Sequence, residues 1–241
     1  MRAIILAAGR GSRLKEITKN KPKCFLNISE KSIIEHQIDS LRKFGIKKIA
    51  VVAGYRKNFF KRLNIKIFIN DKWNTSNMVY SLFNAKSWLF DNNCLICYGD
   101  IFYDENILSE LIKEKGSFVL PSNNNWKKHW KMKYKNPLND LETFKINKNM
   151  HLLQIGSRPK NYSEIQGQFM GLMKIKKSAS QDIFKIFNLL SKKIQKKIQF
   201  TEFINLCVEK HKYKVKTFST NKYWFEIDNK KDLKLLNKFY K

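Results

Sequence analysis

Near its N-terminus the chain reads Leu6-Ala7-Ala8-Gly9-Arg10-Gly11-Ser12-Arg13-Leu14, and shortly afterwards Lys21-Pro22-Lys23. The apolar residues up to Ala8 predict a buried strand, and Gly9 to Ser12 predict a tight loop directly after it. Glycines at the end of a strand let the backbone pass close to a phosphate, with N–H groups facing its oxygens. Arg13 supplies a forked cation and Lys23 a mobile one, and both suit a triphosphate.

This loop differs from two other phosphate-binding loops. It lacks the pattern G-x-x-x-x-G-K-[S/T], and Leu14 stands where G-x-G-x-x-G has its third glycine. A single G-x-G is also typical of a structural turn with two surface cations beside it. The residues of the loop, taken alone, leave both interpretations open.

Beyond the loop, apolar runs alternate with amphipathic stretches. The runs are apolar throughout instead of alternating with polar residues, which is typical of a parallel sheet with helices on both faces. We therefore predict an α/β fold with a mostly parallel sheet. The expected strands are 48–53, 66–70, 94–98, 118–121 and 215–218, and the expected helices are 32–44, 77–90, 106–115, 181–190, 201–210 and 230–239.

The alternation breaks between about residues 122 and 180. Tryptophans, charges and short strand-like pieces at 142–146 and 167–175 occupy this part of the chain. We interpret it as a small lid inserted into a single domain that spans residues 1–241, since this length suits one α/β domain with an insert.

The net charge of +28 is the most unusual feature of the composition. A basic nucleic-acid-binding protein is one interpretation. Against it, the lysines are spread along the chain, and arginine occurs only at Arg2, Arg10, Arg13, Arg42, Arg56, Arg62 and Arg158. We expect a solvated lysine surface that favours anionic substrates but does not bind nucleic acid.

The apolar stretches of the chain are short. None approaches the roughly 20 residues that a membrane span needs, and the N-terminal run is too short for a signal segment. We therefore expect a cytoplasmic protein without membrane contact.

The pair Cys94 and Cys97 has no second pair to complete a zinc site, so we expect it to lie in a core strand.

The pattern L-A-A-G-x-G-[S/T]-R-L with a downstream K-P-K resembles the signature of the sugar-phosphate-type nucleotidyltransferases. Within them the chain looks most similar to the bacterial cytidylyltransferases that act on phosphocholine, 2-aminoethylphosphonate and phosphoglutamine. The stretches 126–134, 136–143 and 165–172 look closest to the phosphoglutamine and phosphonate branch. The resemblance covers nearly the whole chain, and four further segments carry it: 70–73, 76–82, 98–100 and 224–228.

This resemblance implies a Rossmann-like fold with a small inserted lid subdomain and a role in surface polysaccharide or phosphonate biosynthesis. It implies that an acceptor phosphate or phosphonate oxygen attacks the α-phosphorus of CTP and that pyrophosphate leaves. Mg²⁺ is the implied cofactor, and the protein is expected to be a monomer or homodimer. A hexose-1-phosphate nucleotidyltransferase is the alternative within the family, although the chain is short and lacks a C-terminal β-helix.

The resemblance also implies site residues. Lys23, Arg13 and Asp100 would be catalytic. Asp100 and Asp228 would bind the metal ion, with Glu226 as the alternative to Asp228. The implied nucleotide-binding residues are Leu6, Ala8, Gly9, Gly11, Ser12, Asn77 and Ser81.

For the acceptor we expect Trp126, Trp130, Glu142, Gln168 and Glu226. Their aromatic faces and acidic groups suit an acceptor with a cationic amine. Tyr134, Tyr223 and Trp224 offer further aromatic faces, and Asp140 a further acid. The sequence also leaves structural roles open. The aromatic residues could instead pack within the lid, and Asn77, Glu226 and Asp228 lie where they could cap a helix.

Overall fold

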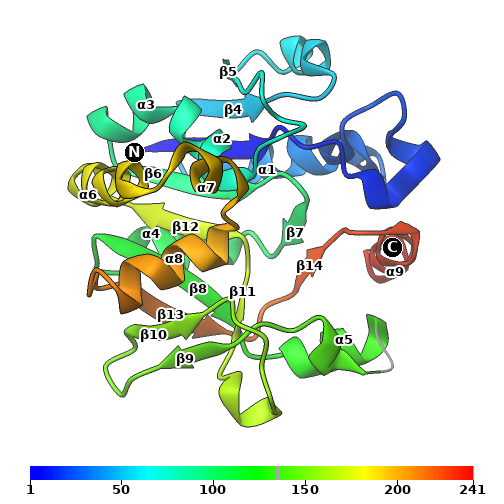
Figure 1. Ribbon diagram of the computed structural model, residues 1–241. Coiled ribbons are helices and arrows are strands. Elements are labelled where there is room, and N and C mark those ends of the chain that lie inside the picture. Colours follow the sequence, from blue (N-terminus) through cyan, green and yellow to red (C-terminus); the bar gives the residue numbers. More distant parts are fainter. Residues whose placement is uncertain (134–135, 241) are drawn as a thin grey trace.

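In the computed structural model, which describes residues 1–133 and 136–240, eight strands of the described chain form a central sheet (Figure 1). Their order is β11-β8-β12-β6-β1-β4-β5, and β13 pairs with β8. The strands are β1 (Arg2–Ala7), β4 (Ile49–Ala53), β5 (Lys66–Ile69), β6 (Cys94–Tyr98), β8 (Phe118–Asn123), β11 (Gln168–Phe169), β12 (Leu172–Ile175) and β13 (Lys216–Thr220).

Most neighbouring strands of this sheet are parallel. β1 pairs in parallel with β4 and β6, β4 with β5, and β13 with β8. β12 runs antiparallel to both β6 and β8, and β11 runs antiparallel to β8. The predicted α/β fold with a mostly parallel sheet is therefore confirmed.

Helices pack on both faces of the sheet. In Figure 1, α2, α3, α6, α7 and α8 lie in front of it, and α1 and α4 lie behind it. The helices are α1 (Ile33–Lys43), α2 (Met78–Asn84), α3 (Lys86–Asp91), α4 (Asn106–Lys113), α5 (Trp126–Lys133), α6 (Lys177–Leu189), α7 (Lys192–Lys197), α8 (Phe200–Glu209) and α9 (Lys230–Phe239). Short 3-10 helices cover Ser12–Thr18, Lys23–Phe25, Lys57–Leu63, Pro137–Asn139 and Tyr162–Glu164.

Three two-stranded pairs lie outside the central sheet. They are β2 (Asn27–Ile28) with β3 (Lys31–Ser32), β9 (Phe144–Ile146) with β10 (Leu152–Ile155), and β7 (Ile101–Tyr103) with β14 (Trp224–Glu226). The β7–β14 pair is antiparallel. It matters most for the site, because it brings the C-terminal part of the chain against the segment that follows β6.

Two expected elements are divided in the structure. The single helix expected over 77–90 breaks at Ala85, whose backbone (φ −97°, ψ 21°) is not helical, so α3 can turn to pack against α6. The single strand expected over 167–175 breaks at Gly171, which has a φ of 70°. The turn there allows β11 and β12 to pair with different parts of the sheet.

The inserted segment ends earlier than the expected boundary at 180. β12, which lies within the range expected for the insert, is a central strand between β6 and β8. Among the described residues, the part that leaves the sheet is therefore 124–133 and 136–167, with α5 and the β9–β10 pair. Cys94 and Cys97 lie buried in β6, as predicted. No helix in the described ranges is long and apolar enough to cross a bilayer.

Gly99 is packed tightly between the ends of β6 and β1. A methyl group at this position would lie 2.8 Å from the Cβ of Ala7 and 2.9 Å from the carbonyl oxygen of Leu6. We expect Gly99→Ala to lower the free energy of unfolding by about 1–3 kcal/mol, since overpacking forces backbone shifts. Urea denaturation measures this.

Gly9→Ala is the matched control, because a methyl group there meets nothing within 4 Å. Equal stability of the two variants would contradict the close approach of β6 to β1.

Candidate active site

The site lies where β1 and β6 end, at the carboxyl edge of the sheet, which is where open α/β sheets bind their ligands. The chain turns after β6 through Gly99 and Asp100, and the Gly99 N–H donates to the carbonyl oxygen of Leu6 (2.9 Å). This turn fixes Asp100 beside the loop that follows β1.

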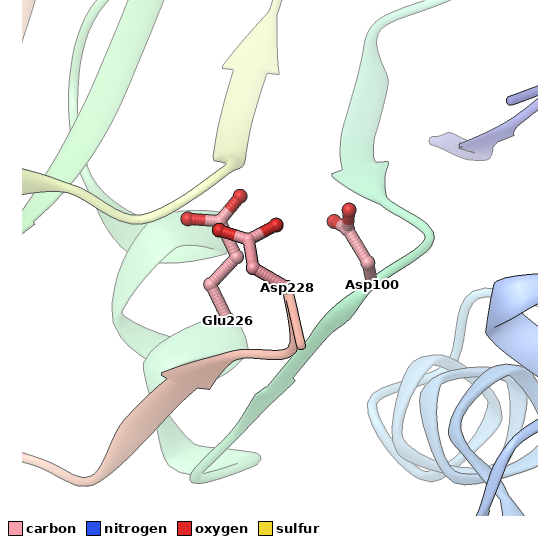
Figure 2. Close-up of side chains that lie close together, drawn as sticks. All are labelled: Asp100, Glu226 and Asp228. Atoms are coloured by element: carbon pink, nitrogen blue, oxygen red, sulfur yellow. The ribbon is translucent and has the colours of Figure 1, made fainter. Parts of the chain in front are cut away.

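Two more carboxylates come from the C-terminal part of the chain. β14 pairs with β7 so that Glu226 faces Ile101, and the Ile227 N–H donates to the carbonyl oxygen of Asp100 (3.0 Å). Figure 2 shows the side chains of Asp100, Glu226 and Asp228 pointing into the same space. One oxygen from each lies within 4.8 Å of those from the other two. Backbone pairing therefore assembles a carboxylate cluster, which we define as these three residues.

Two cations pair with members of this cluster. The Lys23 Nζ lies 2.8 Å from Asp100 Oδ2 and 3.2 Å from Asp228 Oδ1. The Arg13 Nη2 lies 2.7 Å from Asp228 Oδ1. Lys23 is buried whereas Arg13 is mostly exposed, with side-chain exposures of 10% and 67%. Lys23 is thus the internal counter-ion of the cluster.

Burial and neighbouring charges shift the pKa values of Lys23 and Glu226. Burial disfavours the ammonium form of Lys23, but the carboxylates of Asp100, Asp228 and Glu226 outweigh it and raise the pKa of Lys23 above its usual value. For Glu226, burial and then repulsion from Asp228 and Asp100 raise the pKa to about 8. Without a metal ion, Glu226 therefore carries a proton near neutral pH, while Lys23 keeps its charge.

The carboxylate cluster can hold a metal ion. Oδ1 of Asp100 is buried and has no hydrogen-bond partner among the described residues, so this oxygen is available as a ligand. Three carboxylates offer the hard oxygen donors that cations such as Mg²⁺ bind. Capping of α9 does not explain Asp228, because Asn229 caps that helix through its Oδ1. Glu226 ends β14, so it does not cap a helix either.

A cavity of about 300 Å³ lies between the loop after β1 and the start of α2. Arg13, Lys23, Asp100 and Asp228 lie along one part of its wall. All of the residues expected to bind the nucleotide line it as well: Leu6, Ala8, Gly9, Gly11, Ser12, Asn77 and Ser81. We call this the first cavity.

Gly11 shows why the loop needs glycine. Its φ of 70° lies in the left-handed region, and a methyl group at this position would approach the Lys23 Cδ to 2.8 Å. The aliphatic stem of Lys23 therefore passes directly over Gly11 on its way to the carboxylate cluster. The second glycine of the G-x-G pattern is therefore in direct contact with the lysine of the downstream K-P-K.

Asn77 and Ser81 are fixed by polar contacts. The Asn70 Nδ2 donates to Ser81 Oγ (2.9 Å). Asn77 stands at the N-cap position of α2, but its side chain caps nothing and instead donates to the carbonyl oxygen of Lys197. Side-chain capping is therefore not the role of Asn77.

A second cavity, of about 320 Å³, adjoins the first. Trp130, Glu142, Gln168 and Glu226 line it, and it shares Arg13, Met78, Gln199 and Asp228 with the first cavity. The two cavities therefore meet at the carboxylate cluster. This arrangement can hold two molecules with their reactive groups next to the same cations.

Polar contacts order the wall of the second cavity. The Trp130 Nε1 donates to Asp140 Oδ2 (3.1 Å), and the Trp130 ring stacks on Trp224 at 5.9 Å. The Thr201 Oγ1 donates to Glu142 Oε1 (3.1 Å), while burial raises the pKa of Glu142. The Gln168 side chain donates to the carbonyl oxygen of Glu142 (2.7 Å).

Two of the expected aromatic residues lie elsewhere. The Trp126 ring packs 6.0 Å from Tyr162 and is not among the residues that line the second cavity. Tyr223 stacks on Phe102 at 6.0 Å and does not line it either. Trp126 and Trp130 do lie on one buried side of α5, as their spacing predicts. Tyr134 falls outside the described residues.

Sequence reasoning missed several residues of the site. The Gln37 Nε2 donates to the carbonyl oxygens of Tyr98 (2.9 Å) and Ile101 (2.7 Å), which lie on either side of Asp100. Met78 and Gln199 line both cavities. The only signal for Gln37 was a polar residue on the apolar side of an amphipathic helix. Met78 lies in the segment 76–82 that carries the resemblance but was given no role, and nothing marked Gln199.

The chain matches the family described as the MobA-like NTP transferase domain over residues 3–158. The chain belongs to this family. The transferase is also 33% identical, over 251 residues, to the CTP:phosphoglutamine cytidylyltransferase of Campylobacter jejuni, with 98% of both chains covered. The resemblance inferred from the N-terminal loop is therefore confirmed.

Solved structures share the fold of the transferase. The CTP:phosphocholine cytidylyltransferase from Streptococcus pneumoniae matches with a TM-score of 0.72 and 20% identity, covering 100% of this chain and 99% of that one. The inositol-1-phosphate CTP transferase from T. maritima matches with a TM-score of 0.76 and 20% identity, covering 98% and 95%. The predicted Rossmann-like fold is thus confirmed.

The raised pKa of Glu226 predicts a pH dependence of stability. Its folded value of about 8 exceeds its ordinary value of 4.5, so the folded transferase binds an extra proton between these limits. The free energy of unfolding should therefore fall as the pH rises through this window in EDTA. Glu226→Gln should reduce the slope, measured by urea unfolding at several pH values.

Glu16→Gln serves as the control, since Glu16 is exposed and lines neither of the two cavities. A slope that is the same in the wild type and in Glu226→Gln would show that Glu226 does not bind this proton.

Proposed function

We propose that this transferase is a Mg²⁺-dependent cytidylyltransferase. It would transfer CMP from CTP to a small phosphorylated or phosphonylated acceptor and release pyrophosphate. The main support is that two cavities meet at a carboxylate cluster with Lys23 inside it. A transfer between two phosphate-bearing molecules needs such an arrangement, because both must present oxygens to the same cations.

In the proposed reaction the nucleotide occupies the first cavity. The loop from Gly9 to Ser12 faces the triphosphate with its backbone, Arg13 contacts the β- and γ-phosphates, and Lys23 contacts the α-phosphate. These cations stabilise the charge that builds on the leaving pyrophosphate. The acceptor oxygen is already ionised near neutral pH, so no residue needs to remove a proton from it.

The carboxylate cluster supplies the metal site in this proposal. Asp100 and Asp228 are the proposed ligands, and Glu226 is the alternative to Asp228 as the second one. A bound Mg²⁺ ion would neutralise charge on the phosphate oxygens. Oδ1 of Asp100, which has no hydrogen-bond partner among the described residues, supports this assignment.

The preference for CTP is supported by the Campylobacter jejuni relative, whose name gives CTP as its nucleotide. That relative aligns with 98% of this chain, so the similarity includes the segments around both cavities. A cytoplasmic location, no binding of nucleic acid, and a monomeric or homodimeric state remain predictions.

The second cavity favours an acceptor that carries a cationic amine. Its described lining has four acidic residues, Asp140, Glu142, Glu226 and Asp228, and one basic residue, Arg13. Even with a proton on Glu226, the carboxylates outnumber the guanidinium. The faces of Trp130 and Trp224 add a surface that attracts cations. A zwitterionic acceptor fits this balance better than a neutral-bodied sugar phosphate. Phosphocholine, an aminoalkylphosphonate and phosphoglutamine are acceptors of this kind.

The nucleotide and metal parts of the proposal can be tested with four NTPs, an acceptor panel and a pyrophosphate readout. We expect CTP to be used at least about tenfold better than UTP, ATP or GTP, a difference of about 1.4 kcal/mol. Excess EDTA should abolish turnover. Asp100→Asn should lower kcat at least about 100-fold, as expected for the loss of an electrostatic contact in the transition state.

Asp182→Asn, which changes a half-exposed acid on α6, is the control. A clear preference for UTP would favour the hexose-1-phosphate alternative, and full activity in EDTA would exclude the metal role.

The acceptor part of the proposal concerns Glu142. We expect phosphocholine, 2-aminoethylphosphonate or phosphoglutamine to give a far higher kcat/KM than glucose-1-phosphate. Glu142→Gln should lower kcat/KM for the zwitterionic acceptor more than it weakens CTP binding, because it removes a carboxylate from the second cavity only. Steady-state kinetics and nucleotide titrations measure both effects.

Glu164→Gln is a suitable control, since Glu164 lies in the same inserted segment but pairs with Lys145 away from both cavities. Faster turnover of glucose-1-phosphate would contradict the proposed acceptor class. Unchanged kinetics of Glu142→Gln would leave that carboxylate a structural role.

A further inference from the structure

Lys133, the last residue of α5, is a largely buried lysine outside the carboxylate cluster. Its side chain is 11% exposed, whereas Lys131 on the same turn is exposed. The Lys133 Nζ donates to the carbonyl oxygen of Glu226 (2.9 Å) and lies 3.3 Å from Asp232 Oδ1. Lys133 thus contacts the segment that carries two of the three clustered carboxylates.

Asp232 extends this contact to Asp228. It lies in the first turn of α9, and its side chain is 4% exposed. Its second oxygen, Oδ2, accepts hydrogen bonds from the backbone N–H groups of Asp228 (2.8 Å) and Asn229 (3.0 Å). Lys133 and Asp232 together therefore hold both ends of the segment 226–228 by its backbone.

The same helix also forms part of the second cavity. Trp130 lies one turn before Lys133, lines that cavity, and stacks on Trp224 of β14. The Lys133 Nζ lies 5.8 Å from the centre of the Trp130 ring. In Figure 1, α5 lies beneath β14 and α9. Side chains of α5 thus touch both the cavity and the segment 226–228.

We propose that Lys133 is a positioning residue that couples the second cavity to the carboxylate cluster. An acceptor packed against Trp130 restrains α5, and Lys133 then holds Glu226 and Asp228 in the arrangement that binds a divalent cation. This inference rests on the proposed function for the identity of the acceptor. The contact of Lys133 with the segment 226–228 does not depend on which acceptor binds.

A purely structural role predicts something different. A buried ion pair that only supports the fold would change stability when it is broken, but not the affinity for a metal ion in the folded protein. Groups that orient metal ligands from behind do change that affinity, commonly by about 10–100-fold. Metal affinity therefore separates the two roles.

The test compares Lys133→Met with Lys131→Met, measuring Mn²⁺ binding by calorimetry with and without phosphoglutamine. We expect Lys133→Met to bind Mn²⁺ at least about tenfold more weakly than the wild type. Phosphoglutamine should tighten Mn²⁺ binding less in this variant than in the wild type, since coupling between two sites is reciprocal. Lys131→Met should match the wild type, and Lys133→Arg, which keeps the cation, should recover much of the affinity.

Kinetics give a second readout. With CTP, Lys133→Met should lower kcat at least about tenfold while the KM for CTP changes by less than about twofold. If Lys133→Met does not fold, Lys133→Met/Asp232→Asn replaces it. The amide oxygen of that variant can still accept from Asp228, and no carboxylate is left unpaired.

Different outcomes would contradict the role of Lys133 and the proposed function. Equal Mn²⁺ affinities in the Lys133 and Lys131 variants, or no Mn²⁺ binding by the wild type, would overturn the role of Lys133. A wild type that binds Mn²⁺ but turns over no nucleotide with any acceptor would overturn the proposed function and leave the positioning role standing.

Discussion

Repulsion between three carboxylates is the constraint around which this site is built. Oxygens of Asp100, Glu226 and Asp228 lie within 4.8 Å of one another. At an effective dielectric constant of about 20, two full charges at that distance repel by roughly 3–4 kcal/mol. Lys23 and Arg13 offset the charges of Asp100 and Asp228, and burial with repulsion leaves a proton on Glu226. Without a metal ion, the summed charge of these five residues is therefore close to zero.

The backbone, more than side-chain packing, keeps these groups together. The β7–β14 pairing sets the distance between Asp100 and Asp228, and the Gln37 amide holds the carbonyl groups on either side of Asp100. Backbone pairing limits how far these carboxylates can move apart, and their repulsion favours a bound cation or proton. The ammonium of Lys23, a proton on Glu226 and a divalent cation at the cluster would therefore compete for one set of oxygens.

Much of the fold and part of the candidate site could be predicted from the sequence. Buried parallel strands such as β1 and β6 appear as apolar runs, and the loop after β1 carries its own glycines, so both are visible locally. The place of β12 in the centre of the sheet is not visible, because pairing between distant strands leaves no local pattern. Gln37 and Lys133 act through carbonyl groups far away in the chain. In a chain with 48 lysine and arginine residues, nothing marks the buried ones.

The chain is strongly basic overall, but most of the charged residues that line the second cavity are acidic. The chain carries +28 overall, yet the described lining of the second cavity has four acids and one arginine. Salt screens exposed charges beyond about 8 Å at physiological ionic strength, so surface lysines farther away than this contribute little to the charge inside the second cavity. In the proposed function, the surface attracts anions of any kind, and the second cavity selects those that also carry a positive group. A strongly basic composition is thus compatible with a small zwitterionic ligand, and a nucleic-acid partner is not needed to explain it.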